Sequence, residues 1–139
     1  MALFRADRLE LQVPDNWRND TVYRFETFDD EEKFSMKIEH HTEDHPLDKH
    51  LEQKTQTVRE ERVQARLASS GDTRLADLPA KYYVIEALRG DEVPIIYTAV
   101  IAKLHPLQLL IVDFESPRER WGQSRAIFDS MLRSIRNAG

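Results

Sequence analysis

The residues best suited to chemistry are four histidines within one short segment of this 139-residue chain. Carboxylates lie among them, and the whole set is His40, His41, Glu43, Asp44, His45, Asp48 and His50. Such groups could hold a metal ion or act as a proton switch, but a metal needs two or three imidazoles that converge. Pro46 argues against a helix that would bring His41 and His45 together, because the residue before a proline avoids the α region. We therefore predict a polar loop between a strand and a helix, and no metal site.

The sequence lacks the motifs that accompany catalysis. It has no nucleophile elbow, zinc-protease motif, P-loop or dinucleotide-binding loop, and four glycines could hardly build the glycine-rich ones. Cysteine is absent, which excludes thiolate catalysis and Cys-ligated metals. The acidic run from Asp29 to Glu32 is interpreted as a solvated turn, because an acid/base pair needs one desolvated carboxylate. We expect neither enzyme activity nor a cofactor.

The composition is typical of a single globular domain over residues 1–139. Hydrophobic residues make up 40% and charged residues 32%, with a formal net charge of −5. A net negative charge argues against nucleic acid as a partner. Nothing resembles a signal peptide, and no apolar run is long enough to span a membrane. We expect a cytoplasmic protein that does not insert into membranes.

The elements that would position these residues begin with three strands. Apolar residues alternate with polar ones around 9–13, 21–27 and 34–38, which indicates half-buried strands. A helix is predicted from Leu47 to about Leu67, since this stretch contains no glycine or proline, and Ser69–Asp72 is expected to end it.

The second half predicts three more strands and a helix. The strands are Tyr82–Leu88, Ile95–Ala102 and Leu107–Phe114, and Gly90 is expected to adopt positive φ in the first turn. Ser116 is the predicted N-cap of the last helix, with Pro117 at its first position. The order β-β-β-α-β-β-β-α indicates an α+β domain, a largely antiparallel sheet packed against two helices.

Strands 95–102 and 107–114 are apolar on both faces, whereas a sheet with one wet face should alternate. The expected hairpin places Ile101 beside Leu110 and Ala99 beside Val112, and a slip of one residue would exchange the faces. The apolar stripe of the first helix is too narrow to cover a second face. Either a homodimer or sheet curvature buries that face, or the face is a groove for an apolar partner.

Three motifs resemble those of a known family. They are Leu9-x-Leu11-x-Val13-Pro14-Asp15-x-Trp17, then Leu78-Pro79-Ala80 before a strand, and the ending Trp121…Ser130-Met131-Leu132. Together with the order of elements they resemble DcrB-like proteins and, more narrowly, the Eag chaperones of type VI secretion. Asp77 stands where relatives commonly have glycine.

The resemblance implies a PsbP-like fold and a cytosolic homodimer without catalysis or cofactor. Such chaperones bind the apolar N-terminal segments of PAAR-containing effectors until these are loaded on the secretion spike. The family's groove would map onto Tyr97, Ala99, Ile101, Leu110 and Val112. Ala99 replaces a glutamine common in the groove, so Gln53 or Lys54 of the first helix would supply the polar contact. The alternative is a non-catalytic PsbP-like structural or regulatory subunit whose apolar sheet face forms a homodimer or a complex.

Overall fold

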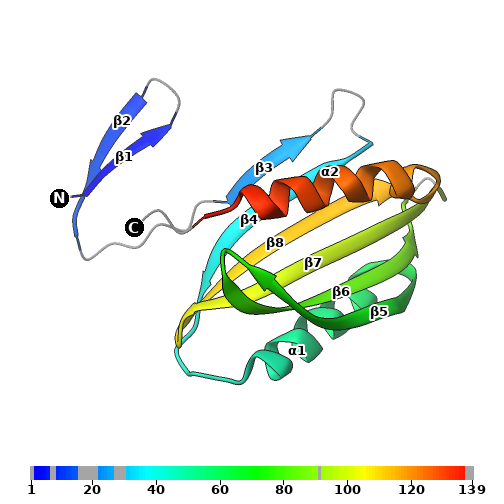
Figure 1. Cartoon of the computed structure of the whole chain (residues 1–139), viewed down its shortest axis with the longest axis horizontal. Coiled ribbons are helices and arrows are strands. Elements are labelled where there is room, and N and C mark those ends of the chain that lie inside the picture. The colour runs from blue at the N-terminus through cyan, green and yellow to red at the C-terminus, as the bar shows by residue number, and fades with distance from the viewer. Residues whose placement is uncertain (1, 7–8, 16–21, 27–30, 91, 137–139) are drawn as a thin grey trace.

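The computed structural model describes residues 2–6, 9–15, 22–26, 31–90 and 92–136 (Figure 1). The strands are β1 (Ala2–Ala6), β2 (Leu9–Val13), β3 (Val22–Glu26), β4 (Lys33–His40), β5 (Val63–Leu75), β6 (Leu78–Leu88), β7 (Pro94–His105) and β8 (Gln108–Pro117). The helices are α1 (Leu47–Glu61), the 3-10 turn η1 (Arg118–Arg120) and α2 (Trp121–Ser134). Six strands form one antiparallel sheet in the order β3-β4-β8-β7-β6-β5. The predicted α+β class is confirmed, and β1 and β5 are additional to the predicted order.

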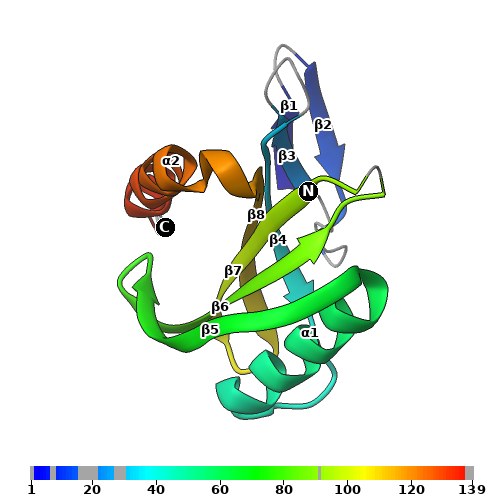
Figure 2. The same cartoon turned by 90° about the vertical axis from the view of Figure 1, so that its right-hand side faces the viewer.

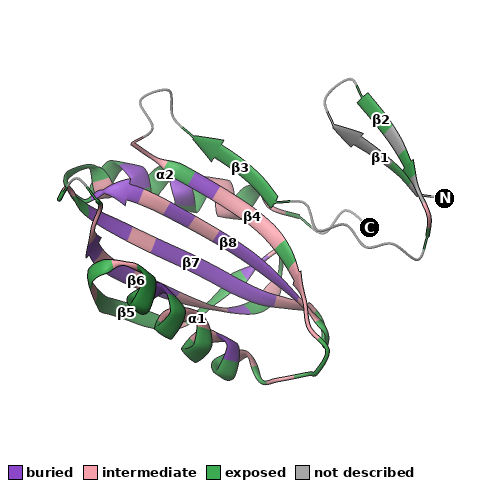
Figure 3. Ribbon diagram, turned by 180° about the vertical axis from the view of Figure 1, so that it is seen from behind, coloured by how far each residue is buried: buried purple, intermediate pink, exposed green. Residues whose placement is uncertain are grey.

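The two helices lie on opposite faces of a curved sheet (Figure 2). Successive side chains of a strand point to opposite faces, so β7 contributes to two separate clusters. Val100 and Ala102 pack with Phe128 of α2 on the concave side, whereas Ala99 packs with Val58 of α1 on the other. Central strands β7 and β8 are therefore mostly buried along their length (Figure 3). The doubly apolar strands of the sequence are explained by one helix on each face.

The first helix is shorter than predicted. Arg62 has an extended backbone (φ −111°, ψ 146°), so α1 ends at Glu61 and the chain continues as β5 along one edge of the sheet. The predicted extension to Leu67 was wrong. Val58 and Ala65 pack on the same apolar cluster, which suggested one helical stripe, but Val58 belongs to α1 and Ala65 to β5. β5 is exposed over most of its length and therefore lacks the alternation of a half-buried strand.

The reversals of the chain also differ from the predicted ones. Ser69–Asp72 lies inside β5, and the chain turns instead at Ala76 and Asp77, whose φ values are 50° and 63°. Positive φ at both central residues is typical of a two-residue hairpin and explains why glycine suits the position of Asp77. Between β6 and β7 it is Glu92 (φ 64°), and not Gly90, that adopts positive φ.

The C-terminal helix begins later than predicted. Ser116 does not cap it: the residue is buried at the end of β8, and its hydroxyl donates to Ser124 Oγ of α2 at 2.9 Å. Pro117 precedes η1, and α2 starts at Trp121. The predicted apolar face is confirmed, because Trp121, Phe128 and Met131 pack on the concave side of the sheet.

Strands β1 and β2 form a separate hairpin that stands away from the sheet (Figure 1). Trp17 and the start of the predicted acidic turn, Asp29 and Asp30, lie outside the described residues. Within the described ranges, no helix is long and apolar enough to cross a membrane.

Candidate functional site

The predicted groove residues lie on two different faces. The observed register pairs Ile101 with Ile111 and Val100 with Val112, so Leu110 and Val112 face α2 whereas Tyr97, Ala99 and Ile101 face α1. The expected register was wrong by one residue, because the β7–β8 hairpin contains an irregularity between Lys103 and His105. A slip of one residue moves a strand's side chains to the other face.

The face that carries Ala99 and Ile101 is closed by α1. Their exposed fractions are 0% and 1%, and Leu51 packs on the clusters of both. The apolar stripe of α1 is thus wide enough to cover this part of the sheet, contrary to the expectation. On the same helix, Gln53 is exposed, and Lys54 Nζ donates to Glu39 Oε2 of β4 at 2.5 Å. These residues do not form an open groove.

An open groove lies instead between α2 and strands β5, β6 and β7. Figure 2 shows that α2 lies on this side of the sheet. Its volume is about 370 Å³, which is within the range of small ligand sites. Its lining consists of Ser69, Thr73, Tyr82, Val84, Thr98, Val100, Trp121, Arg125, Phe128, Asp129 and Leu132. We call it the α2 groove.

Three hydroxyl groups in the lining of the α2 groove have hydrogen-bond partners. Thr98 Oγ1 donates to the carbonyl of Tyr83 at 2.9 Å, and the hydroxyls of Tyr82 and Ser69 lie 3.3 Å apart. Gly71 of β5 provides the space for the Tyr82 ring, since a Cβ at Gly71 would lie 3.2 Å from Tyr82 Cε1. The exposed charged side chains of the lining, Arg125 and Asp129, lie on α2.

Contacts between aromatic rings hold α2, which forms one wall of the α2 groove, against strands β8 and β4. Phe128 stacks on Phe114 of β8 with ring centroids 5.0 Å apart and an angle of 8° between the planes. The Trp121 ring lies 6.4 Å from Phe114, and Phe34 packs edge-on against Phe128. The lining residues of α2 recur at intervals of three or four, so one helical stripe faces the groove along its whole length.

The sequence did not predict the β5 side of the groove, because residues up to about Leu67 were assigned to a helix and Ser69–Asp72 to the turn that ends it. Ser69 and Thr73 are small polar residues on an exposed edge strand, and such a strand has no apolar periodicity to reveal it. The sequence did contain a signal for the α2 side of the groove. The spacing of Trp121, Phe128 and Leu132 indicated the packed face of the last helix.

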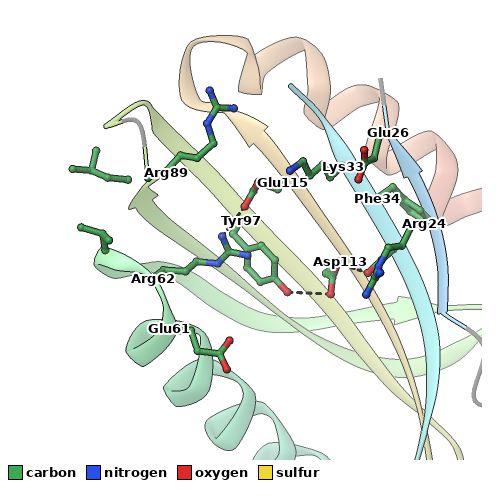
Figure 4. A pocket seen from close by; sticks show the side chains of 14 residues that line it. Arg24, Glu26, Lys33, Phe34, Glu61, Arg62, Arg89, Tyr97, Asp113 and Glu115 are labelled. Atoms are coloured by element: carbon green, nitrogen blue, oxygen red, sulfur yellow. Dashed lines mark hydrogen bonds and ion pairs between the residues drawn. The ribbon is translucent and has the colours of Figure 1, made fainter. Parts of the chain in front are cut away.

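A second, larger cavity of about 560 Å³ opens on the α1 side, at the C-terminal end of α1 (Figure 4). Four cationic side chains and four anionic ones line it: Arg24, Lys33, Arg62, Arg89, Glu26, Glu61, Asp113 and Glu115. We call it the charged cavity. Tyr97 is the member of the predicted groove that lies in it.

Polar contacts connect the groups at the floor of the charged cavity. The Tyr97 hydroxyl donates to Asp113 Oδ2 at 3.0 Å, and Ser35 Oγ donates to Asp113 Oδ1 at 2.5 Å (Figure 4). The Arg62 guanidinium lies 4.2 Å from the Tyr97 ring centroid, and Arg62 Nη1 lies 2.6 Å from Glu115 Oε1. These contacts fix the side chains against one another.

The tyrosines of this region are poor acids. Burial raises the pKa of Tyr83 to about 12, and burial together with neighbouring Tyr83 and Asp113 raises the pKa of Tyr97 further above its usual range. Neither phenol forms a phenolate near neutral pH, so the charged cavity lacks a tyrosinate nucleophile or base.

The histidines converge more than predicted. Although Pro46 does precede the helix, the ring centroid of buried His50 lies 4.7 Å from that of His41 and 5.7 Å from that of His45. Burial lowers the pKa of His50, and the two neighbouring imidazoles lower it further. Within the described part of the chain, no three donor residues are arranged to hold a metal ion.

Comparisons with known proteins show the fold. No family model matches the chain, and no curated protein is similar to it in sequence. The structure is similar to that of a Pseudomonas aeruginosa protein of unknown function, with a TM-score of 0.79, 14% identity, and coverage of 100% of this chain and 98% of that one. It is also similar to CyanoP, the PsbP protein of the cyanobacterium Synechocystis, with a TM-score of 0.55, 13% identity, and coverage of 89% and 96%. The chain therefore has a PsbP-like α+β fold.

Proposed function

We propose that this protein is a non-catalytic chaperone that shields an apolar segment of a partner protein in the α2 groove. The finer form of the proposal follows the resemblance to the Eag chaperones. The partner is then the apolar N-terminal segment of a PAAR-containing effector, which is kept in solution in the bacterial cytoplasm until it is loaded on the secretion spike. The observation that carries the proposal is an open groove that contains Val84, Val100, Trp121, Phe128 and Leu132, and in which the Thr98 hydroxyl is bonded to the carbonyl of Tyr83.

The lining suits an apolar segment energetically. A segment that buries four large apolar side chains in the groove would gain roughly 6–12 kcal/mol before costs. Loss of translational freedom and ordering of the segment remove much of this gain. The Thr98 hydroxyl already donates to the carbonyl of Tyr83, so a polar peptide group placed above it would lose a hydrogen bond to water without replacement. The groove therefore favours apolar segments over polar ones.

Co-expression with an apolar N-terminal effector segment tests the proposal. We expect the segment to remain soluble and to co-purify with this chain. Ser69→Trp should abolish capture, since the new indole fills the groove from an exposed edge strand without touching the core. Ser70→Trp is the matched control, because Ser70 is the next residue of β5, is also exposed and is not part of the lining.

Two outcomes would contradict this function. One is capture that Ser69→Trp and Ser70→Trp reduce equally, with both variants folded by circular dichroism. The other is an effector segment that stays insoluble beside well-folded protein. Either would favour a PsbP-like structural or regulatory subunit. Such a subunit would have to use another surface, because the apolar sheet residues on both faces lie beneath helices.

A further inference from the structure

The charged cavity lies on the opposite face of the sheet from the α2 groove, and capture of an apolar segment makes no use of it. Its volume of about 560 Å³ is within the range of small-ligand sites. Three polar side chains in contact form its floor: Ser35 of β4, Tyr97 of β7 and Asp113 of β8 (Figure 4). The charges of this floor and of the rim around it determine which ligand the cavity suits.

Asp113 is a half-buried carboxylate with no ion-pair partner among the described residues. Its two oxygens accept one hydrogen bond each, from the hydroxyls of Ser35 and Tyr97. An ionised carboxylate has about four acceptor positions, so roughly half of those on Asp113 stay open. Hydrogen bonds from a cation to a carboxylate are stronger than those between neutral groups. Asp113 therefore suits an ammonium group.

The other carboxylate that β8 contributes to the cavity is already paired. Arg62 Nη1 lies 2.6 Å from Glu115 Oε1, and the same guanidinium lies 4.2 Å from the centroid of the Tyr97 ring. Tyr97 itself stays neutral, because burial raises the pKa of its hydroxyl. The negative charge that remains unbalanced on the floor is that of Asp113.

Two cations of the rim complement this charge. Arg24 of β3 and Lys33 of β4 are exposed, and neither has an ion-pair partner in the part of the chain that the structure describes. Arg24 lies opposite Ser35, which lies opposite Asp113, so the three residues form one row across β3, β4 and β8. Adjacent strands are about 4.8 Å apart, which places the Cα atoms of Arg24 and Asp113 about 10 Å apart. Lys33 lies opposite Glu115 in the next row on the same face.

The remaining carboxylates of the rim lie outside the row of Asp113. Glu26 lies opposite Lys33 in the β3–β4 pair. Glu61 is the last residue of α1 and lies on the α1 side of the cavity, away from β3 (Figure 4). The row itself therefore has a negative group at its β8 end and a positive group at its β3 end.

We propose that the charged cavity binds a small zwitterion, an amino acid or a dipeptide, whose ammonium group bonds to Asp113 and whose carboxylate bonds to Arg24. An arginine can hold a carboxylate through two parallel hydrogen bonds. Lys33 adds positive charge near the carboxylate end. An amine without a carboxylate leaves Arg24 unused, and a carboxylate without an amine leaves Asp113 unused. The inference is independent of the proposed chaperone function, which uses the other face.

Titration of the full chain with dialanine, followed by the NMR signals of the backbone amides, tests the site. We expect saturable shifts in β3, β4 and β8. Titration with alanine distinguishes an amino acid from a dipeptide as the preferred ligand. Propylamine and propionate carry one of the two charges each, and both should bind at least roughly tenfold more weakly than the preferred zwitterion.

Two variants assign the ends of the ligand. Asp113→Asn keeps an acceptor for the hydroxyls but removes the charge, and it should weaken zwitterion binding roughly tenfold while leaving propionate binding undiminished. Arg24→Gln, at an exposed position, should weaken zwitterion binding to a similar extent while leaving propylamine binding undiminished. Arg133→Gln is the control, because Arg133 is an exposed arginine of α2 outside the lining of both cavities.

Three results would overturn the proposal. The first is the absence of saturable shifts with both alanine and dialanine. The second is propylamine binding as tight as that of the zwitterion. The third is tighter zwitterion binding by Arg24→Gln, which would mean that Arg24 competes for Asp113 instead of holding the ligand. Ser69→Trp should bind the zwitterion normally, so that failure of the α2 groove and failure of the charged cavity are observed separately.

Discussion

The charged cavity and the α2 groove lie on opposite faces of one sheet and differ in the residues that line them. The charged cavity on the α1 side is the larger, about 560 Å³ against about 370 Å³ for the α2 groove. Eight of its lining residues are charged, and Arg62 pairs with Glu115 while Asp113 accepts from the Tyr97 hydroxyl. Only two lining residues of the α2 groove, Arg125 and Asp129, are charged. The proposed binding of an apolar segment in the α2 groove therefore rests on the residues of the lining and not on the volume of the cavity.

The largest expected effect comes from a charge beneath α1. Ala99→Asp should destabilise the protein by about 3–5 kcal/mol, because the carboxylate would be buried without a partner. Much of a typical domain's stability would be lost. Thermal denaturation should show a lost or strongly lowered transition. Thr73→Asp, at an exposed lining position of the α2 groove, should fold normally and reduce only capture of an apolar segment.

If Ala99→Asp instead folded normally and abolished capture, the α1 face would be the binding face. The α2 groove would then be part of the packed structure and not the site of capture.

A smaller effect is expected in the charged cavity. Arg62→Met keeps the aliphatic stem but removes the contact of the guanidinium with the Tyr97 ring and with Glu115. We expect a loss of about 1–2 kcal/mol of stability, measured by urea denaturation, and no change in capture. Arg59→Met in the last turn of α1, where the side chain is exposed, is the control. Loss of capture in Arg62→Met alone would give the charged cavity a part in binding.

The histidine cluster makes the α1 side sensitive to pH. Since the pKa of His50 is lowered in the folded protein, the unfolded chain takes up a proton at about pH 6.5, before the folded chain does. The stability associated with neutral His50 is therefore present above about pH 6.5 and is lost as the pH falls below it. Melting temperatures between pH 7.5 and 5.5 should decline in the native sequence and decline less in His50→Gln. An equal decline in both would assign the effect to other groups.

The smallest effect concerns the hairpin that borders the α2 groove. Ala76 has a φ of 50°, and this conformation costs a residue with a Cβ about 1–2 kcal/mol of strain. Glycine would remove the strain, but its more flexible unfolded chain would cost about 0.5–1 kcal/mol of folding free energy. Ala76→Gly should therefore stabilise the protein by about 0.5–1 kcal/mol. Ala68→Gly, at a β5 position without positive φ, should destabilise it. If both changes destabilise, the turn is not strained.

The sequence predicted the buried parts of this fold well and its exposed edges poorly. Strands such as Ile95–Ala102 are apolar because helices cover both faces, and the Trp121–Phe128–Leu132 spacing indicated the packed face of α2. The first residues of β5 were assigned to a helix and Ser69–Asp72 to a turn, because an exposed edge strand has no apolar periodicity. The α2 groove could not be located either, since its position depends on the register of β7 and β8, which one irregular residue in a turn determines.

The direct junction between β8 and α2 limits how the α2 groove can change its width. No loop separates Pro117 from η1, and the hydroxyl pair of Ser116 and Ser124 ties the first turns of α2 to the end of the strand. Further along the helix, Phe128, Met131 and Leu132 pack on the sheet, so α2 is held along its length as well as at its start. Widening the α2 groove would break these contacts, and the groove therefore suits a segment that fits its present width.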